Sequence, residues 1–404
     1  MKLILNMISF IFIFSAIFLP KISFFDTSIV AIFSISAVYI LIYGKKTIYF
    51  DKNLFYVFII LSIYFIYILF VQMAHGVPSV ELIGRTFRSW SFLLLLCISS
   101  KIIIDNDGNT LKYILYCLSI HALLLIVSAN YLPLNIFFGE VFGNDRVRNL
   151  RSSGLVSGFD MAGLFCAIGL LIIATRAVRF KSIFLTFFFV FLFTAASYYS
   201  SRVSMVLCIL IFMYASFELL VKDKSYSSLK RLVIFAAIFS FFVYIFSKIA
   251  IIFEVALNLG LFSVEGDEAQ MVAERFSSAT VDEAASGYSL FDMYFIPSTD
   301  MKLLFGDGTD QPYSDVGYIK FLFWNGVIGL LIIYILHIYL IIKTFINMKY
   351  SNVNYKVLIF ALYFMIFVLT LKNNYLLTRG IFPLILIVYL HSIWVSENSR
   401  ARLR

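Results

Sequence analysis

Long apolar runs, each about the length of a membrane-spanning helix, dominate the chain from its first residues to its last. A helix needs about 20 mostly apolar residues to cross the hydrocarbon core of a bilayer. Twelve runs meet this requirement: residues 3–19, 26–43, 54–72, 85–101, 113–130, 159–175, 182–197, 203–221, 232–251, 317–342, 357–372 and 380–395. The pattern predicts an all-α polytopic membrane protein with about 12 transmembrane helices.

One long polar segment, residues 252–316, interrupts this pattern and holds twelve of the 23 acidic residues. A segment of this length without apolar periodicity is unusual in a compact domain, and is usually functional or disordered where it occurs. The chain therefore divides into helices one to nine (residues 1–251), a large loop before the tenth span (252–316), and helices ten to twelve with a tail (317–404). Within the loop, the mostly polar stretch 264–285 predicts a surface helix.

Composition agrees with a membrane protein and excludes a water-soluble globule. The chain is 62% hydrophobic and 14% charged, with a mean hydropathy of +0.95, whereas soluble proteins are about 45–50% apolar and about 25% charged. All four cysteines fall inside apolar runs, which favours packing roles over a disulfide or a metal framework. The first run lacks a small-residue cleavage site, so we interpret it as a span rather than a signal peptide.

The positive charges predict the orientation of the chain. With the N-terminus in the cytoplasm, the seven inward-facing segments carry 19 of the 32 lysines and arginines. The positive-inside rule therefore places both termini in the cytoplasm and the acidic loop outside. This sidedness accounts for the net charge of +9 without a nucleic-acid partner.

Arginine is concentrated on the side that this topology assigns to the outside. Eight of the thirteen remaining basic residues are arginines: Arg85, Arg88, Arg146, Arg148, Arg151, Arg202, Arg275 and Arg379. The positive-inside rule does not explain them. The planar guanidinium group binds phosphate through two parallel hydrogen bonds, so the pattern indicates an anionic ligand at the outer leaflet.

Four of these arginines lie at the ends of spans. Arg85 and Arg88 are three residues apart and share one helical face, although both could instead reach towards the membrane interface. Arg202 lies in a tight turn between two apolar spans, where a charge is costly and indicates function. Its alternative role is that of an interfacial turn residue, and for Arg379 both interpretations stay open.

A second group of arginines precedes the sixth span. Arg146, Arg148 and Arg151 lie in the loop before Gly154 and Gly158, and a helix begins directly afterwards. Glycine permits close backbone approach, and a helix N-terminus attracts anions. The stretch is therefore a candidate anion site, the alternative being a solvated basic loop.

Acidic residues flank the return to the membrane. Asp307, Asp310 and Asp315 have no histidine nearby, and their spacing does not match a calcium loop, so we predict no metal and no cofactor. A general base must lie near the hydroxyl that it deprotonates. Asp315, directly before the tenth span, is the best-placed candidate.

Together these motifs resemble the O-antigen polymerase (Wzy) family and the related O-antigen ligases. The resemblance rests on four stretches: Arg148–Gly158, Ser200–Ser204, Leu304–Gly308 and Asp315–Gly329. The ligases open the last motif with a histidine where this chain has Asp315, which favours a polymerase. Relatives also often begin the last helix of the loop with Ser/Gly-Arg, whereas this chain has Ser286-Gly-Tyr288.

The resemblance implies a GT-C-like glycosyltransferase at the periplasmic face of the bacterial inner membrane. Its substrates would be undecaprenyl-pyrophosphate-linked oligosaccharides, and its partners the membrane lipids, a chain-length regulator and a flippase. Arg202 and Asp315 would be catalytic. The other arginines except Arg275, together with Tyr318, would bind pyrophosphate or glycan.

Two alternatives stay open from the sequence. An O-antigen ligase would transfer finished glycan to the lipid A core. A lipid-linked oligosaccharide flippase or other transporter also fits twelve spans, but it would be expected to show pseudo-symmetric halves and charges within its spans.

Overall fold

The computed structural model describes residues 2–22, 25–44, 51–76, 80–106, 108–143, 151–178, 180, 182–222, 295–308, 316–349, 353–372 and 374–403. The chain divides into two compact units, Met1–Ser204 with Tyr294–Arg404, and Met205–Met293. Of the second unit, the structure describes only the continuation of helix α10.

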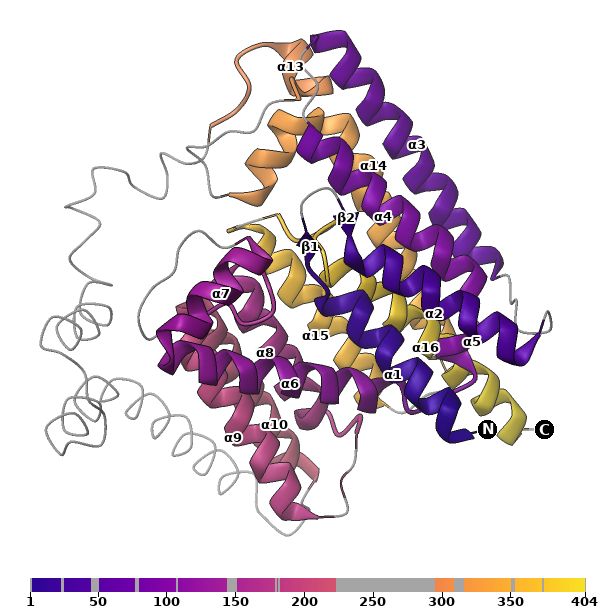
Figure 1. Cartoon of the computed structure of the whole chain (residues 1–404), viewed down its shortest axis with the longest axis vertical. Helices are drawn as coiled ribbons and strands as arrows, with labels where there is room; N and C mark the ends of the chain where they lie inside the picture. The colour runs from indigo at the N-terminus through magenta and orange to yellow at the C-terminus, as the bar shows by residue number, and fades with distance from the viewer. Residues whose placement is uncertain are drawn as a thin grey trace, which may run out of the picture. The chain divides into compact units, whose positions relative to one another are not determined.

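The described residues form α-helices and one small hairpin (Figure 1). The helices are α1 (Lys2–Phe18), α2 (Thr27–Tyr43), α3 (Lys52–His75), α4 (Val80–Ser99), α5 (Lys101–Ile104), α6 (Thr110–Asn130), α7 (Leu132–Phe142), α8 (Phe159–Ala174), α9 (Ile183–Ser200), α10 (Arg202–Lys222), α13 (Asp300–Phe305), α14 (Gly317–Asn347), α15 (Val353–Thr370) and α16 (Ile381–Leu403). The hairpin pairs β1 (Lys21–Ile22) antiparallel with β2 (Phe25–Asp26).

Eleven of the twelve predicted apolar ranges coincide with a helix, and the twelfth, 232–251, lies outside the described residues. Among the described residues, six helices are long and apolar enough to cross a membrane: α3, α4, α6, α9, α14 and α16. Shorter apolar helices are α1, α2, α7, α8 and α15. The structure thus confirms a helical protein with several helices long and apolar enough to cross a membrane, whereas the number twelve and the orientation stay predictions.

Three short helices and the hairpin were not predicted. Helix α7 lies within the stretch 131–158 that we expected to be a loop. Its Pro133 in the first turn and Gly143 in the left-handed conformation after its last residue (φ 72°) are good end signals. At 11 residues it is too short for a search based on spans. The predicted helix 264–285 lies outside the described residues.

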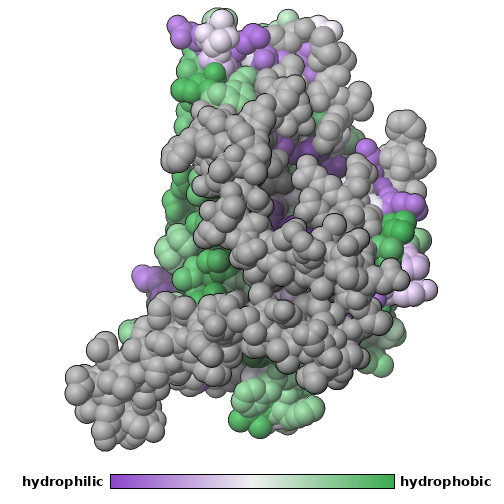
Figure 2. Space-filling view, turned by 90° about the vertical axis from the view of Figure 1, so that its left-hand side faces the viewer, coloured by the Kyte–Doolittle hydropathy of each residue, from purple (hydrophilic) through white to green (hydrophobic). Residues whose placement is uncertain are grey.

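Burial separates inner helices from helices that face outwards. Helix α8 is buried continuously from Met161 to Ile173, whereas α9 exposes large aromatic side chains such as Phe184, Phe187 and Phe191. Helices that are apolar on every face are typical of a membrane environment. On the face drawn in Figure 2, apolar residues line much of the left-hand edge, and hydrophilic residues lie at the top and on the right-hand side.

Polar contacts join the helix ends that the sequence assigns to the cytoplasm. The Tyr389 hydroxyl donates to the Asp51 carboxylate at 2.6 Å, and the Tyr339 hydroxyl donates to the Asn53 side chain at 3.1 Å. The Asp51 carboxylate also caps the N-terminus of α3 through the backbone N–H of Leu54. These bonds fix α3, α14 and α16 against one another at this end.

Helix α14 is broken at Gly326, where φ is 61° and ψ is −172°. This backbone region is accessible essentially only to glycine. Gly306 (φ 79°), directly after α13, packs against the break so closely that a Cβ atom there would lie 2.6 Å from the backbone nitrogen of Asn325. The Tyr67 hydroxyl donates to the carbonyl of Asn325 at 2.7 Å and lies 3.0 Å from that of Phe305.

The residues after α13 complete the packed contact between α13 and the break in α14, which we call the joint. The backbone N–H groups of Asp307 and Gly308 donate to the carbonyl of Phe323, at 2.8 and 3.2 Å. The Gln72 side chain donates to the carbonyl of Gly308 at 3.3 Å. The stretch Leu304–Gly308 and the glycine-containing start of α14 are therefore two halves of one packed unit. In the sequence they are two separate motifs.

The joint predicts that Gly326→Ala lowers stability by roughly 1–3 kcal/mol or more, because alanine is strained at this φ and its Cβ collides with the carbonyl of Leu304. Thermal unfolding of the purified protein in detergent measures the loss. Gly84→Ala is the matched control: it lies in a helix with no heavy atom near the added Cβ, and is expected to be neutral or slightly stabilising. Equal stability of the two variants would contradict the account of the joint.

Candidate functional site

A cavity of about 760 Å³ lies where the hairpin and several helix ends meet. It is lined from the end of α1, the hairpin, the starts of α2, α4 and α8, the end of α7, and the turn before α16. Its charged lining residues are Lys21, Asp26, Arg85, Arg88, Glu140 and Arg379. Four cationic side chains thus face two anionic ones. The cavity brings together Arg85, Arg88 and Arg379, which the sequence indicated as candidate ligands of an anion.

Each arginine reaches the cavity for a local reason. Arg85 and Arg88 lie on one face of α4, as their spacing predicts. Arg379 lies in the turn before α16, next to Gly380 with φ 79°. A Cβ at Gly380 would lie 2.7 Å from the carbonyl oxygen of Ile17. Only glycine therefore lets this turn approach the end of α1.

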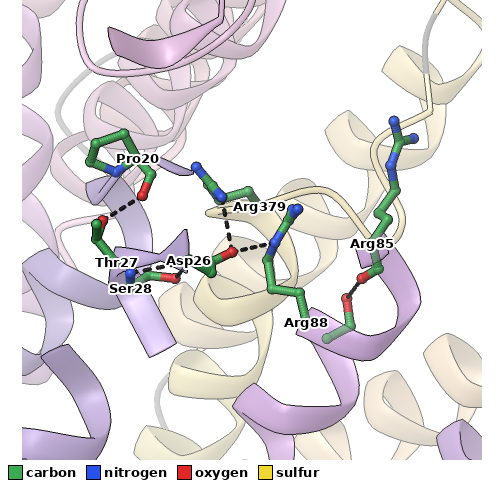
Figure 3. A network of polar contacts seen from close by, with 8 residues as sticks. Pro20, Asp26, Thr27, Ser28, Arg85, Arg88 and Arg379 are labelled. Atoms are coloured by element: carbon green, nitrogen blue, oxygen red, sulfur yellow. Dashed lines mark hydrogen bonds and ion pairs between the residues drawn. The ribbon is translucent and has the colours of Figure 1, made fainter. Parts of the chain in front are cut away.

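Asp26 is the centre of the cluster (Figure 3). Its Oδ2 atom accepts a hydrogen bond from Arg379 Nη2 at 2.9 Å and forms an ion pair with Arg88 Nε. Its Oδ1 atom accepts from the backbone N–H of Ser28 at 3.1 Å and from the Ser28 hydroxyl. Asp26 thus caps α2 with one oxygen and joins α4 to the turn before α16 with the other.

The cluster is mostly removed from solvent. The exposed fractions of the side chains are 12% for Asp26, 22% for Arg88 and 19% for Arg379. Burial alone raises the pKa of the Asp26 carboxyl, but Arg379, the Ser28 hydroxyl and Arg88 outweigh this effect and leave the pKa below its usual value. Asp26 is therefore a carboxylate at neutral pH, with two arginines sharing its single charge.

Arg85 takes a different direction from Arg88. In Figure 3 its side chain points away from Asp26. Its guanidinium carbon lies 4.8 Å from the centre of the Trp324 ring, a cation–π geometry. Trp324 lies in α14 directly before Asn325 and the break at Gly326. Arg85 therefore connects the cavity with the joint between α13 and α14.

Arg151 lies beside the cavity but does not line it. Its Nε atom donates to the carbonyl of Ser200 at 2.7 Å, and its guanidinium carbon lies 4.3 Å from the centre of the Phe159 ring. The Asn135 side chain donates to the carbonyl of Arg151 at 2.8 Å. Arg151 thus joins α7, α8 and the end of α9.

The residues after Arg151 are packed rather than solvated. Ser152 and Ser153 are buried, and the backbone N–H of Ser152 donates to the carbonyl of Tyr199 at 3.1 Å. Gly154, with φ 55°, packs against the ring of His121. The described part of this stretch, residues 151–154, is therefore packed against neighbouring helices, and the anion site itself stays a prediction. Residues 155–158 continue from this part into the cavity lining.

The remaining sequence candidates lie elsewhere. Arg202 is exposed at the start of α10 and does not line the cavity. The Tyr318 hydroxyl donates to the carbonyl of Phe367 at 2.8 Å, so it joins α14 to α15. Arg146, Arg148 and Asp315 lie outside the described residues. Within the described part of the chain, no three or more His, Cys, Asp or Glu side chains group so as to hold a metal ion.

The sequence analysis missed Lys21, Asp26 and Glu140, which all line the cavity. Asp26 had one local signal, because Asp26-Thr-Ser28 before an apolar run is a typical helix start. Lys21 and Glu140 had only their predicted position outside the membrane. Nothing in the sequence links Asp26 to Arg379, 353 residues away.

The Asp26 cluster predicts a pH dependence of stability. Since the pKa of Asp26 is lower in the folded than in the unfolded chain, its contribution is present above the unfolded value of about 3.9 and is lost as pH falls through the folded value. Asp26→Asn should lower stability by roughly 1–3 kcal/mol at pH 7, and the difference from wild type should shrink below about pH 4. Melting temperatures of both proteins from pH 7 to pH 3 test this, and a pH-independent difference would contradict it.

In comparisons with known proteins, no protein-family model and no curated protein matches this chain. The resemblance to the O-antigen polymerases therefore rests on the short motifs.

Proposed function

We propose that this protein is an O-antigen or polysaccharide polymerase of the bacterial inner membrane. It transfers a glycan from undecaprenyl pyrophosphate to a lipid-linked repeat unit, with its active site facing the periplasm. A chain-length regulator and a flippase are its proposed partners.

The observation that carries the proposal is the convergence of Arg85, Arg88 and Arg379 on one cavity. A polymerase of this kind releases a lipid pyrophosphate, and arginine groups already in place stabilise the charge that develops on a leaving group. Every segment that lines the cavity belongs to the side that the positive-inside pattern assigns to the outside. A lipid-linked substrate displayed at the outer leaflet would meet the cavity there.

The reaction needs an acceptor, a leaving group and a base. A hydroxyl oxygen of the acceptor sugar attacks the anomeric carbon of the donor. The bond from that carbon to the pyrophosphate oxygen breaks, and its electron pair leaves with the lipid pyrophosphate. The hydroxyl proton passes to a carboxylate. Asp315 is the candidate from the sequence, and Glu140, which lines the cavity, is a second one.

One structural feature favours this proposal over transport. Transporters bind their substrates near the middle of the membrane, whereas the charged cavity lies at helix ends. The ligase alternative shares the chemistry of the leaving group. It differs only in the acceptor, so a measurement of the product separates the two enzymes.

Deletion of the gene in its host is expected to leave single repeat units on the lipopolysaccharide, without the ladder of longer chains. A gel of the surface lipopolysaccharide measures this. Complete loss of glycan from lipid A would indicate the ligase or the flippase. An unchanged ladder would refute all three assignments.

Arg88→Gln and Arg379→Gln are each expected to reduce chain extension by about 10²–10³-fold, because each removes a positive charge from beside the leaving group. Ladder length and a transfer assay with purified protein measure the loss. Arg176→Gln is the matched control, because this exposed arginine follows α8 at the end opposite to the cavity. Full activity in both cavity variants would place the pyrophosphate elsewhere.

Arg202→Ala tests whether an arginine that does not line the cavity is also needed for chain extension. The sequence argument predicts loss of chain extension with normal expression. If the cavity alone binds pyrophosphate, this variant retains more activity than Arg379→Gln, because Arg202 does not line the cavity. Side-by-side transfer rates for the two variants decide the order.

A further inference from the structure

Asp26 is an unexpected residue in a cavity proposed to bind an anion. Its carboxylate occupies the space between two arginines that would otherwise face a phosphate group. A carboxylate at this place repels an anionic ligand. Its position therefore calls for a functional explanation as well as a structural one.

Asp26 contacts only one nitrogen atom of each of the two guanidinium groups. Arg88 contacts it through Nε and Arg379 through Nη2, and both contacts end on the single atom Oδ2. Neither pair is thus the parallel, two-bond pair that a guanidinium forms with a carboxylate or a phosphate. Among the described residues, the buried Nε atom of Arg379 has no hydrogen-bond partner. The two guanidinium groups retain donors for a further anion.

Asp26 itself is held independently of the arginines. Its Oδ1 atom accepts two hydrogen bonds from Ser28 at the start of α2. The carboxylate therefore keeps its place when the arginines turn towards another anion, and it is ready to pair with them again afterwards.

We propose that Asp26 is a built-in counter-ion that competes with the diphosphate group of the ligand for Arg88 and Arg379, and so sets the affinity of the cavity for diphosphates. The inference rests on the proposed function and names the group recognised, a diphosphate. Asp26 is a positioning residue: it acts through the arginines. By competing, it weakens the binding of the diphosphate product and speeds its release.

Binding of inorganic pyrophosphate to the purified full-length protein in detergent tests the inference, with Asp26→Asn as the main variant. Asparagine is as good an N-cap as aspartate, so the start of α2 is kept while the charge is removed. Removal of one unit charge near the ligand is expected to tighten binding by about tenfold or more. The gain should shrink at high salt.

Asp51→Asn is the matched control. Asp51 caps α3 as Asp26 caps α2, but it lies away from the cavity and accepts a hydrogen bond from Tyr389. This variant is expected to leave the pyrophosphate affinity unchanged. Arg379→Gln is expected to weaken binding. The double variant Asp26→Asn with Arg379→Gln removes one charge of each sign, and it should bind more tightly than Arg379→Gln alone.

The double variant keeps the test valid if Asp26→Asn alone does not fold. Weaker or unchanged binding in the Asp26 variants would overturn the inference, since Asp26 would then be only a scaffold. Absence of binding in every protein, with an intact polysaccharide ladder in cells, would also overturn it and leave the polymerase standing. Tighter binding by Asp26→Asn in a protein whose deletion leaves the ladder unchanged would keep the diphosphate site and refute the polymerase.

Discussion

The ion cluster around Asp26 is the interaction on which the cavity depends. Apolar helices pack against one another with little to distinguish one register from the next, so polar contacts at their ends fix relative positions. The Asp26 carboxylate joins the start of α2, the first half of α4 and the turn before α16. Because two of these contacts are charge-assisted hydrogen bonds or ion pairs in a mostly buried place, they are stronger than contacts between neutral groups.

Glycine allows the second constraint, which is close contact between backbones. Gly380 brings the turn carrying Arg379 against the end of α1, and Gly306 with Gly326 locks α13 into the break of α14. The two constraints meet at Arg85, which lines the cavity and lies over Trp324 beside that break. A movement of the break would therefore shift one cationic group of the cavity.

Hydrophobic runs were sufficient to predict most helices, because a span is recognised by length and apolarity alone. The eleven ranges confirmed as helices needed no knowledge of their partners. The predicted orientation of the chain added a chemical prediction, because the positive-inside rule does not explain arginines on the outer side of the membrane. Arg85, Arg88 and Arg379 were selected in this way, and the cavity brings them together.

The sequence could not reveal which arginines meet. Arg151 has the same predicted outward position as Arg379, yet it bonds to the carbonyl of Ser200 while Arg379 reaches Asp26. The difference arises from the packing of α8 and α9 against the stretch after Arg151, which no local pattern records. Helix α7 was missed for another reason: an apolar helix of 11 residues is shorter than any span.

An arginine cluster whose charge is partly neutralised by a carboxylate also suits an enzyme that must release its product after each reaction. Interactions that bind substrate and transition state equally do not raise the rate of the bound complex, whereas interactions that strengthen as charge develops do. In the proposed reaction the pyrophosphate gains negative charge as the glycan leaves. Under this proposal, arginines that are shared with Asp26 would bind the donor diphosphate weakly and the more highly charged leaving group more strongly. The same carboxylate would then compete for them again as the product departs, so that stabilisation of the leaving group would not become inhibition by the product.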